Sequence, residues 1–399
     1  MTLHDRRPHG FALLVIAVVL VGLTLRGPIV GVPPLLTAIQ ADLLLGPATA
    51  GLITSLPLLA FALLSPLVSG LVRRLGVDHT LLLSLLLLGT AIGLRPWTGA
   101  SGLLIGTAVV GIAITIGNVT VPVLVRRDAG RHVPQVMAVS VGAYGIGQTL
   151  AVYLAVPMAS VAGWRWSIML PGVFVALALG VWLVRMWATE SWQRTSLGGR
   201  RASNAVTWSH VWRQGSAWWL AAFFGLQSLI FYTASTWLPA QLVATAGMNE
   251  RTAGTALSVF HLVGIAGTFL VPTMLRWAGD ARRVGVGVAL GWLVFFVGLY
   301  LAPIGWVGWM ALGGIVHGAG IGLALTLVAT RPHDVEYGRY VSGMVQGVGY
   351  GLAAVGPVLI GWLADVTSGW TIPTVLMVAS ALVMVFVAHQ AGSSRPIGP

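Results

Sequence analysis

The sequence predicts an all-α membrane protein with twelve transmembrane helices in two six-helix halves, and three observations lead to this fold class. Hydrophobic residues make up 57% of the 399 residues and charged residues only 8%, which is too little charge to cover the surface of a soluble domain of this length. The apolar residues form continuous runs of about 20 or more, long enough to cross a hydrocarbon layer as helices and unlike the alternating strands of a membrane barrel. Residues of the first half recur in the second at a nearly constant separation.

Twelve apolar runs are expected to span the membrane. They cover residues 11–36, 47–72, 79–95, 99–125, 133–157, 165–187, 216–241, 252–275, 284–302, 306–330, 339–364 and 370–389. The long polar stretch 188–215 is expected to be a linker between an N-terminal bundle, residues 1–187, and a C-terminal bundle, residues 216–399. The first run is interpreted as an uncleaved span because Arg26-Gly27-Pro28 follows it, not a small-residue cleavage site.

All 22 positively charged side chains are arginines, because the chain has no lysine, and against 10 acidic residues they give a net charge of +12. These arginines lie in short loops between apolar runs, which excludes the single basic patch of a nucleic-acid-binding protein. With both termini in the cytoplasm, the outer side and the spans keep only Arg26, Arg95, Arg165 and Arg251. The positive-inside rule therefore predicts a multi-pass inner-membrane protein with both ends cytoplasmic, and the loop arginines are assigned mainly to topology.

The internal repeat is carried by small residues, one serine and one arginine. Ala50-Gly51, Ser55, Arg73 and Gly76 in the second span match Ala253-Gly254, Ser258, Arg276 and Gly279 in the eighth, and Gly145 and Gly147 in the fifth match Gly349 and Gly351 in the eleventh. Two parallel six-helix repeats joined by a cytoplasmic linker are the plan of the major facilitator fold, in which the substrate site lies near the midplane between the halves.

Arg26 is the first candidate for substrate binding, because an ionisable side chain at membrane depth usually serves a function. Its guanidinium offers a fork of donors suited to a carboxylate, a cyanate or a nitro group. No aspartate or glutamate lies near the middle of any span, which leaves room for an anionic or strongly dipolar substrate. The alternative is that Arg26 snorkels to the outer interface or caps the carbonyls of a broken helix.

His261 and His317 are expected near the midplane, at a rise of about 1.5 Å per residue. Each is a candidate for binding substrate or for carrying a coupling proton, since histidine titrates near neutral pH. The alternative is a neutral histidine bonded to a neighbouring helix. Further candidate lining groups, which could equally bond helix to helix, are Asn118, Tyr144, Gln148, Gln227, Tyr232, Gln346 and Tyr350.

Glycines and prolines within the spans are candidates for hinges or gates, and tight helix packing is the simpler alternative. The candidates are Gly27, Pro28, Gly145, Gly147, Gly349, Gly351, Gly356 and Pro357. The sequence has no phosphate-binding loop, no cluster with metal-ligand spacing and no nucleophile–base pair. It therefore predicts neither an enzyme nor a protein with a cofactor or a metal site.

Four stretches of the chain resemble the cyanate/2-nitroimidazole (CynX/NimT) branch of the major facilitator superfamily. They are Leu23 to Pro28 with Gly31 to Leu36, Gly117 to Pro122 with Arg126-Arg127-Asp128, Gly225 to Ser228 with Phe231-Tyr232 and Thr236 to Pro239, and Gln346 to Tyr350 with Gly356-Pro357, Asp365 and Gly369-Trp370. The resemblance implies an inner-membrane permease, in a family for which cyanate uptake and 2-nitroimidazole export have been proposed. Two positions depart from it: Gly27 separates Arg26 from Pro28, and Arg73 stands where the superfamily has an acidic residue.

The sequence thus predicts a secondary active transporter, a symporter or antiporter that moves a small anionic or polar solute by alternating access. The site is expected between the halves with Arg26 as partner of the substrate's charge, in a monomer embedded in the lipid bilayer, with the proton as a candidate coupling ion. The alternatives are a proton-coupled exporter of drugs or toxic compounds and a channel. Substrate identity, direction and coupling ion stay open.

Overall fold

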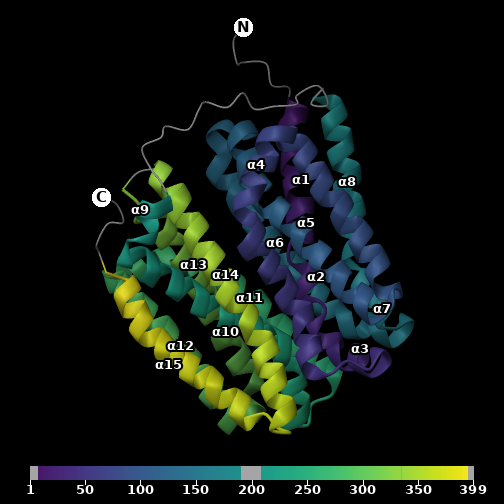
Figure 1. The fold of residues 1–399 in the computed structure, drawn as a ribbon, viewed down its shortest axis with the longest axis vertical. Helices are drawn as coiled ribbons and strands as arrows, with labels where there is room; N and C mark the ends of the chain where they lie inside the picture. Colours follow the sequence, from purple (N-terminus) through teal and green to yellow (C-terminus); the bar gives the residue numbers. More distant parts are fainter. Residues whose placement is uncertain (1–7, 190–207, 334, 394–399) are drawn as a thin grey trace. The chain divides into compact units, whose positions relative to one another are not determined.

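The computed structural model describes residues 8–189, 208–333 and 335–393, and the elements of this part are α-helices and short 3-10 helices (Figure 1). Twelve of its segments are long and apolar enough to cross a membrane, as predicted. They are Phe11–Leu43, Pro47–Ser65, Gly70–Trp97, Gly99–Asp128, Gln135–Ala162, Trp164–Ala188, Gly215–Ala246, Glu250–Ala278, Ala281–Leu301, Pro303–Thr330, Tyr340–Val366 and Thr371–Ala391. The fold class is confirmed.

Contacts within the chain group it into two compact units, which are described separately below. Unit one comprises Met1–Gly31 and Leu63–Ala202, and unit two comprises Val32–Ala62 and Ser203–Pro399. The chain therefore passes from one unit to the other inside its first two spans as well as in the polar stretch. Residues 190–207 of the expected linker lie outside the described residues. The division into 1–187 and 216–399 stays a prediction.

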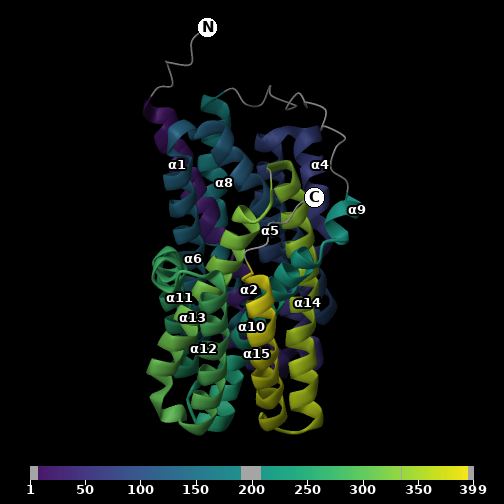
Figure 2. The ribbon, with the colours of Figure 1, turned by 90° about the vertical axis from the view of Figure 1, so that its left-hand side faces the viewer.

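Unit one is built around the first helix, α1, which packs against α6 and α8 (Figure 2). Its elements are α1 (Pro8–Thr24), α2 (Gly27–Val30), the later part of α4 (Pro47–Leu94), η2 (Arg95–Trp97), α5 (Gly99–Asp128), η3 (Gly130–His132), α6 (Val133–Ala162), α7 (Trp164–Met169) and α8 (Pro171–Ala188). Small residues on the facing sides of α1 and α6 allow the two backbones to approach closely.

Unit two pairs its long helices: α10 lies beside α14, α11 beside α13 and α12 beside α15 (Figures 1 and 2). Its elements are η1 (Pro33–Leu35), α3 (Leu36–Leu43), the first part of α4, α9 (Trp208–Trp212), α10 (Gly215–Ala246), α11 (Glu250–Ala278), α12 (Ala281–Leu301), η5 (Pro303–Gly305), α13 (Trp306–Thr330), α14 (Val335–Val366) and α15 (Thr371–Ala391). The start of α4 belongs here because it packs on α14: a Cβ added to Gly51 would lie 2.6 Å from the carbonyl oxygen of Pro357.

The matched glycines Gly76 and Gly279 both have a positive φ. Gly76 interrupts α4 with φ 78°, and Gly279 ends α11 with φ 69°, in the region that glycine adopts without a Cβ clash. An aspartate follows closely in both cases, and the Asp280 carboxylate accepts a hydrogen bond from the Arg282 N–H at 3.0 Å to cap α12. The predicted loop between residues 72 and 79 is therefore a single-residue break at Gly76, with helix on both sides.

Candidate functional site

The first span is broken at Arg26. Helix α1 ends at Thr24 because Pro28 has no N–H to donate to the Thr24 carbonyl, and Pro28 begins α2 instead. Arg26 is the N-cap of α2, with φ −128° and ψ −38°, and its carbonyl accepts from the N–H groups of Ile29 at 3.1 Å and Val30 at 3.2 Å. The proline predicted to break the span therefore does so, and the break places a half-buried arginine near the middle of Phe11–Leu43.

Helix α6 covers the break from within unit one. The Arg26 guanidinium lies close enough to the Tyr144 hydroxyl on α6 to act on it electrostatically. A Cβ added to Gly147 would lie 2.2 Å from the Leu23 carbonyl oxygen, and one added to Gly27 would lie 3.1 Å from the Ala151 Cβ. These glycines thus permit a close helix–helix approach, and their role as hinges stays a prediction.

Changing Gly147 to alanine is expected to destabilise the protein by about 1–3 kcal/mol, because the added methyl group has to push two backbones apart. Gly142 lies on the same helix with open space around its missing Cβ, so Gly142→Ala is a matched control that should be neutral or slightly stabilising. Thermal unfolding in detergent measures both. Equal melting temperatures for the two variants would contradict the close contact.

Arg95 is a buried arginine that the sequence analysis counted among the four arginines of the outer side and the spans, without giving it a role. Its side chain at the end of the third span is fully buried, and Nη2 donates to the Pro28 carbonyl at 3.0 Å. The helical partner of that carbonyl would be the N–H of Val32, which lies beyond the end of α2. Arg95 therefore caps the broken helix, the alternative role considered for Arg26. The signal was present in the sequence: Arg95 lies within an apolar segment, whereas most arginines lie in loops.

In unit two, three helices meet at Gln227 of α10. Its amide Nε2 lies 3.3 Å from His317 Nδ1 and donates to the His317 carbonyl at 3.2 Å. Its Oε1 accepts from Trp292 Nε1 of α12 at 2.9 Å. Phe231, one turn along α10, stacks on the His317 ring with centroids 3.6 Å apart and planes 11° apart. Two predicted site residues, Gln227 and His317, are thus in direct contact.

His261 of α11 borders the same cluster and is completely buried. Its ring meets Phe231 edge-on, with centroids 5.7 Å apart, and Phe260 in the same way at 5.5 Å. Neither ring nitrogen has a hydrogen-bond partner among the described residues. Such a ring is costly to charge in this environment, and its part in binding or proton coupling stays a prediction.

The two predicted tyrosines of unit two lie near each other. Tyr232 and Tyr350 are buried, with ring centroids 6.5 Å apart. Tyr350 also contacts Phe61 and Phe224, each at 5.2 Å. This side of α14 is therefore an aromatic layer, in which the two phenol groups are the polar members among these four rings.

The remaining predicted lining residues are half-buried and scattered. Asn118 lies on α5, Gln148 on α6 and Gln346 on α14, where the Gln346 amide donates to Ser342 Oγ at 2.8 Å. A substrate role for each stays a prediction.

The candidate hinges of α14 take part in its packing on α10. A Cβ added to Gly349 would lie 2.4 Å from Phe224, and one added to Gly356 would lie 2.1 Å from Thr233 Oγ1. The Pro357 carbonyl accepts from Trp237 Nε1 at 2.7 Å. A glycine thus allows a close helix approach in each unit, Gly147 between the fifth and first spans and Gly349 between the eleventh and seventh, although these two glycines are not partners in the repeat.

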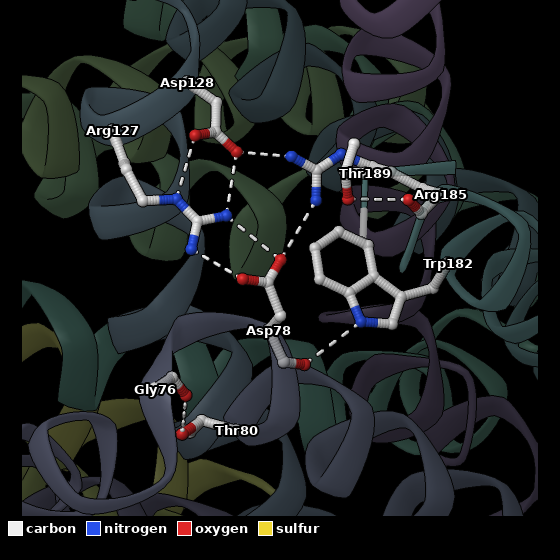
Figure 3. A network of polar contacts seen from close by, with 8 residues as sticks. All are labelled: Gly76, Asp78, Thr80, Arg127, Asp128, Trp182, Arg185 and Thr189. Carbon is white, nitrogen blue, oxygen red and sulfur yellow. Dashed lines mark hydrogen bonds and ion pairs between the residues drawn. The ribbon is translucent and has the colours of Figure 1, made fainter. Parts of the chain in front are cut away.

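A four-residue ion network lies at one end of unit one and joins α4, α5 and α8 (Figure 3). Arg127 binds the Asp78 carboxylate with both terminal nitrogens, at 2.6 and 3.0 Å, and the Asp128 carboxylate through Nε at 2.8 Å. Arg185 donates to Asp78 Oδ1 at 3.2 Å and also to Asp128. The charges of the two arginines and two aspartates cancel.

The surroundings of this network orient it. Trp182 Nε1 donates to the Asp78 backbone carbonyl at 3.2 Å, and the Arg185 guanidinium lies over the Trp182 ring at 4.8 Å. Asp78 is 1% exposed, so these ion pairs are shielded from water. The sequence reasoning placed both aspartates in loops or at span ends and missed the network. The sequence did contain a signal for this network, because acidic residues occur among the arginines at the ends of the second, fourth and sixth spans.

In unit two, Asp280 and Arg331 correspond to Asp78 and Arg127, because each lies close to one repeat length further along the sequence. Burial lowers the pKa of Arg331 from its ordinary value, the Asp280 carboxylate opposes this shift, and Arg282 adds to it. Arg331 also donates to the Gly392 carbonyl at 2.8 Å. An aspartate and an arginine thus act on each other at the ends of matched helices in both units, by direct ion pairs in unit one and by a longer-range electrostatic effect in unit two.

Comparison with known proteins identifies the family. The sequence profile of the Major Facilitator Superfamily matches residues 12–335. The chain is 32% identical to the uncharacterized transporter YycB of Bacillus subtilis, over 99% of this chain and 96% of that protein. It is 34% identical to the 2-nitroimidazole transporter of Escherichia coli, over 96% of each chain, and 26% identical to the cyanate transport protein CynX of Escherichia coli, over 90% of this chain and 91% of that protein.

Two solved structures share the fold. The nucleoside transporter NupG has a TM-score of 0.76 at 11% identity, over 95% of this chain and 100% of that one. A bacterial homolog of the human lysosomal transporter Spinster has a TM-score of 0.75 at 14% identity, over 97% and 98%. The chain therefore belongs to the major facilitator superfamily, in the CynX/NimT branch that its sequence resembles, and is an inner-membrane transporter of small solutes, not an enzyme.

Proposed function

We propose that this protein is a secondary active transporter that moves a small anionic or strongly dipolar solute by alternating access, and that Arg26 binds the electron-rich end of that solute. The observation that carries the proposal is that Arg26, at the break of the first span, is a half-buried arginine. An arginine at such depth is costly unless it faces a cavity, a partner or a ligand. Its planar fork suits a carboxylate, a cyanate or a nitro group.

Arg95 provides a contrast within the same unit. It lies beside the same break, but it is completely buried and donates to the Pro28 carbonyl. The structural task of capping the broken helix is therefore performed by Arg95. The half-buried Arg26 is the arginine of this pair that is better placed to meet a solute.

The relatives support the solute class. One is named a 2-nitroimidazole transporter and another a cyanate transport protein, and both molecules are small with electron-rich oxygen or nitrogen ends. The arginine distribution supports an orientation with both termini in the cytoplasm. His261 and His317 are the candidates for proton coupling.

Counterflow in proteoliposomes tests the transport mechanism. The purified protein is first screened by thermal shift against cyanate, 2-nitroimidazole and aromatic acids, with unsubstituted imidazole as matched control, because a ligand that binds the folded state raises its melting temperature. A solute that binds is expected to enter the vesicles saturably and to be trapped faster when the same solute is preloaded inside. A pH gradient across the same vesicles tests coupling to protons.

Two outcomes would contradict this proposal. Conductance without acceleration by the preloaded solute would indicate a channel. Equal shifts with imidazole and 2-nitroimidazole would show that the nitro group is not recognised.

A further inference from the structure

We propose that His317 is held as the neutral tautomer that carries its proton on Nε2, and that Trp292 and Gln227 are positioning residues that impose this state. A histidine in this state offers a solute a hydrogen-bond donor without a charge. The inference about the tautomer stands on the contacts of unit two alone, and its use toward a solute rests on the proposed transport function.

The orientation of the Gln227 amide follows from Trp292. An indole N–H only donates, so the Gln227 atom 2.9 Å from Trp292 Nε1 has to be the carbonyl oxygen. The amide is completely buried, so water cannot replace this partner. Turning the amide over would set its NH₂ group against the indole N–H and leave two donors facing each other. Trp292 therefore directs the NH₂ group of Gln227 toward α13.

The orientation of the amide decides the tautomer of His317. Gln227 Nε2 donates to the His317 carbonyl at 3.2 Å and lies 3.3 Å from His317 Nδ1. An amide NH₂ group only donates, so Nδ1 has to accept and carries no proton. The proton of the neutral ring is then on Nε2. The direction of donation runs from Trp292 to Gln227 and from Gln227 to His317.

Packing keeps this arrangement rigid. Phe231 stacks on the His317 ring at 3.6 Å and sets its plane. A Cβ added to Gly320 would lie 2.3 Å from the Gln227 carbonyl oxygen, so the amide rests directly against the backbone of α13. Neither the ring nor the amide can turn over without moving these neighbours.

The same contacts oppose protonation of His317, so this inference removes His317 from the two candidates for proton coupling and leaves His261. An imidazolium would place an N–H on Nδ1 against the amide NH₂ group, and relieving this conflict would require the amide to abandon Trp292. The titratable neighbours are His261 of α11, which shares Phe231 and Phe260 with His317, and Tyr232 of α10, which contacts Phe231. None of these carries a formal charge when His261 is neutral. His317 is therefore held as a neutral ring that carries its N–H on Nε2.

Nitrogen-15 NMR of the histidine rings in lipid vesicles tests the tautomer. The His317 signal is assigned by its loss in His317→Gln. The wild-type protein at neutral pH is expected to show His317 with a protonated Nε2 and a bare Nδ1. A proton on Nδ1, or an imidazolium, at the assigned His317 signal of the wild-type spectrum would overturn the inference.

Two variants test the positioning residues. Trp292→Phe removes the donor that orients the amide, so His317 is expected to populate both tautomers. Trp309→Phe on the same helix as His317 removes an indole N–H that donates to the Ala302 carbonyl, and it should leave the His317 signal unchanged. Gln227→Leu removes the NH₂ group that donates to Nδ1, so His317 is expected to lose its preference for the tautomer with the proton on Nε2. An unchanged tautomer in both Trp292→Phe and Gln227→Leu would show that neither residue positions the ring.

Adding 2-nitroimidazole separates the two proposals. If it binds by thermal shift and His317 donates to it, the Nε2 signal shifts while the Nδ1 signal stays in place. Binding with no change at Nε2 would overturn the donor role. Failure of the whole solute panel to bind would count against the proposed transport function and would leave the tautomer decided by the wild-type spectrum.

Discussion

Replacing Asp78 with asparagine is expected to lower the free energy of unfolding by about 3–5 kcal/mol, because it breaks a buried ion network from one side. Asp78 accepts from Arg127 and from Arg185 and is 1% exposed. Its amide replacement would leave two guanidinium groups with one carboxylate, so the balanced network would acquire an uncompensated positive charge. Thermal or denaturant unfolding in detergent measures the change.

Two controls make this result specific. Asp365 is an exposed aspartate near the end of α14, and Asp365→Asn should change stability by less than about 0.5 kcal/mol. Adding Arg127→Gln to Asp78→Asn restores the charge balance, so the double variant should be more stable than the sum of the two single changes predicts. Additive effects would show that Asp78 and Arg127 are not coupled.

Replacing Arg26 with methionine is expected to reduce transport at least roughly 30-fold and to leave the protein folded. Truncating one partner of a hydrogen-bonded charge pair typically costs about 2–5 kcal/mol, which is a factor of roughly 30 to several thousand. Folding should survive because Pro28 and the Arg95 cap set the helix break, and neither depends on the Arg26 side chain. Initial rates in proteoliposomes, normalised to protein inserted, measure the effect.

Three outcomes separate the possible roles of Arg26. Arg26→Lys keeps the charge but loses the bidentate fork, so intermediate activity is expected. Arg251 is exposed at the start of α11, and Arg251→Met should transport normally. Wild-type transport by Arg26→Met would remove this residue from the binding proposal. A loss of melting temperature as large as the loss of transport would assign it a structural role.

Local rules predicted most of the fold. The twelve spans follow from apolar runs, and the break of the first span follows from Pro28, which cannot donate a helical hydrogen bond. The limits of the second and third spans were less predictable. A stretch with two arginines looked like a loop, yet α4 continues through it with one interruption at Gly76, because long arginine side chains can reach water from a helix end.

The candidate site was predictable in part. Gln227 and His317 were identified as polar groups at membrane depth, but their sequence positions could not show that one bonds the other or that Trp292 completes the contact. Arg95 and the Asp78 network were missed for the same reason. Asp78 and Arg185 are 107 residues apart and meet only because α4 and α8 bring them together.

The sequence alone determines the membrane class, the helices and the break at Arg26. In hydrocarbon each span has to form its own backbone hydrogen bonds, which requires a helix. Pro28 lacks an N–H, so one of these hydrogen bonds is missing at a position that the sequence shows. The tertiary structure decided which buried polar groups pair with each other. The examples are the four-charge network, the Arg95 cap and the hydrogen bonds that link Trp292, Gln227 and His317. A side chain's partner depends on which faces of distant helices meet, and that information is not local.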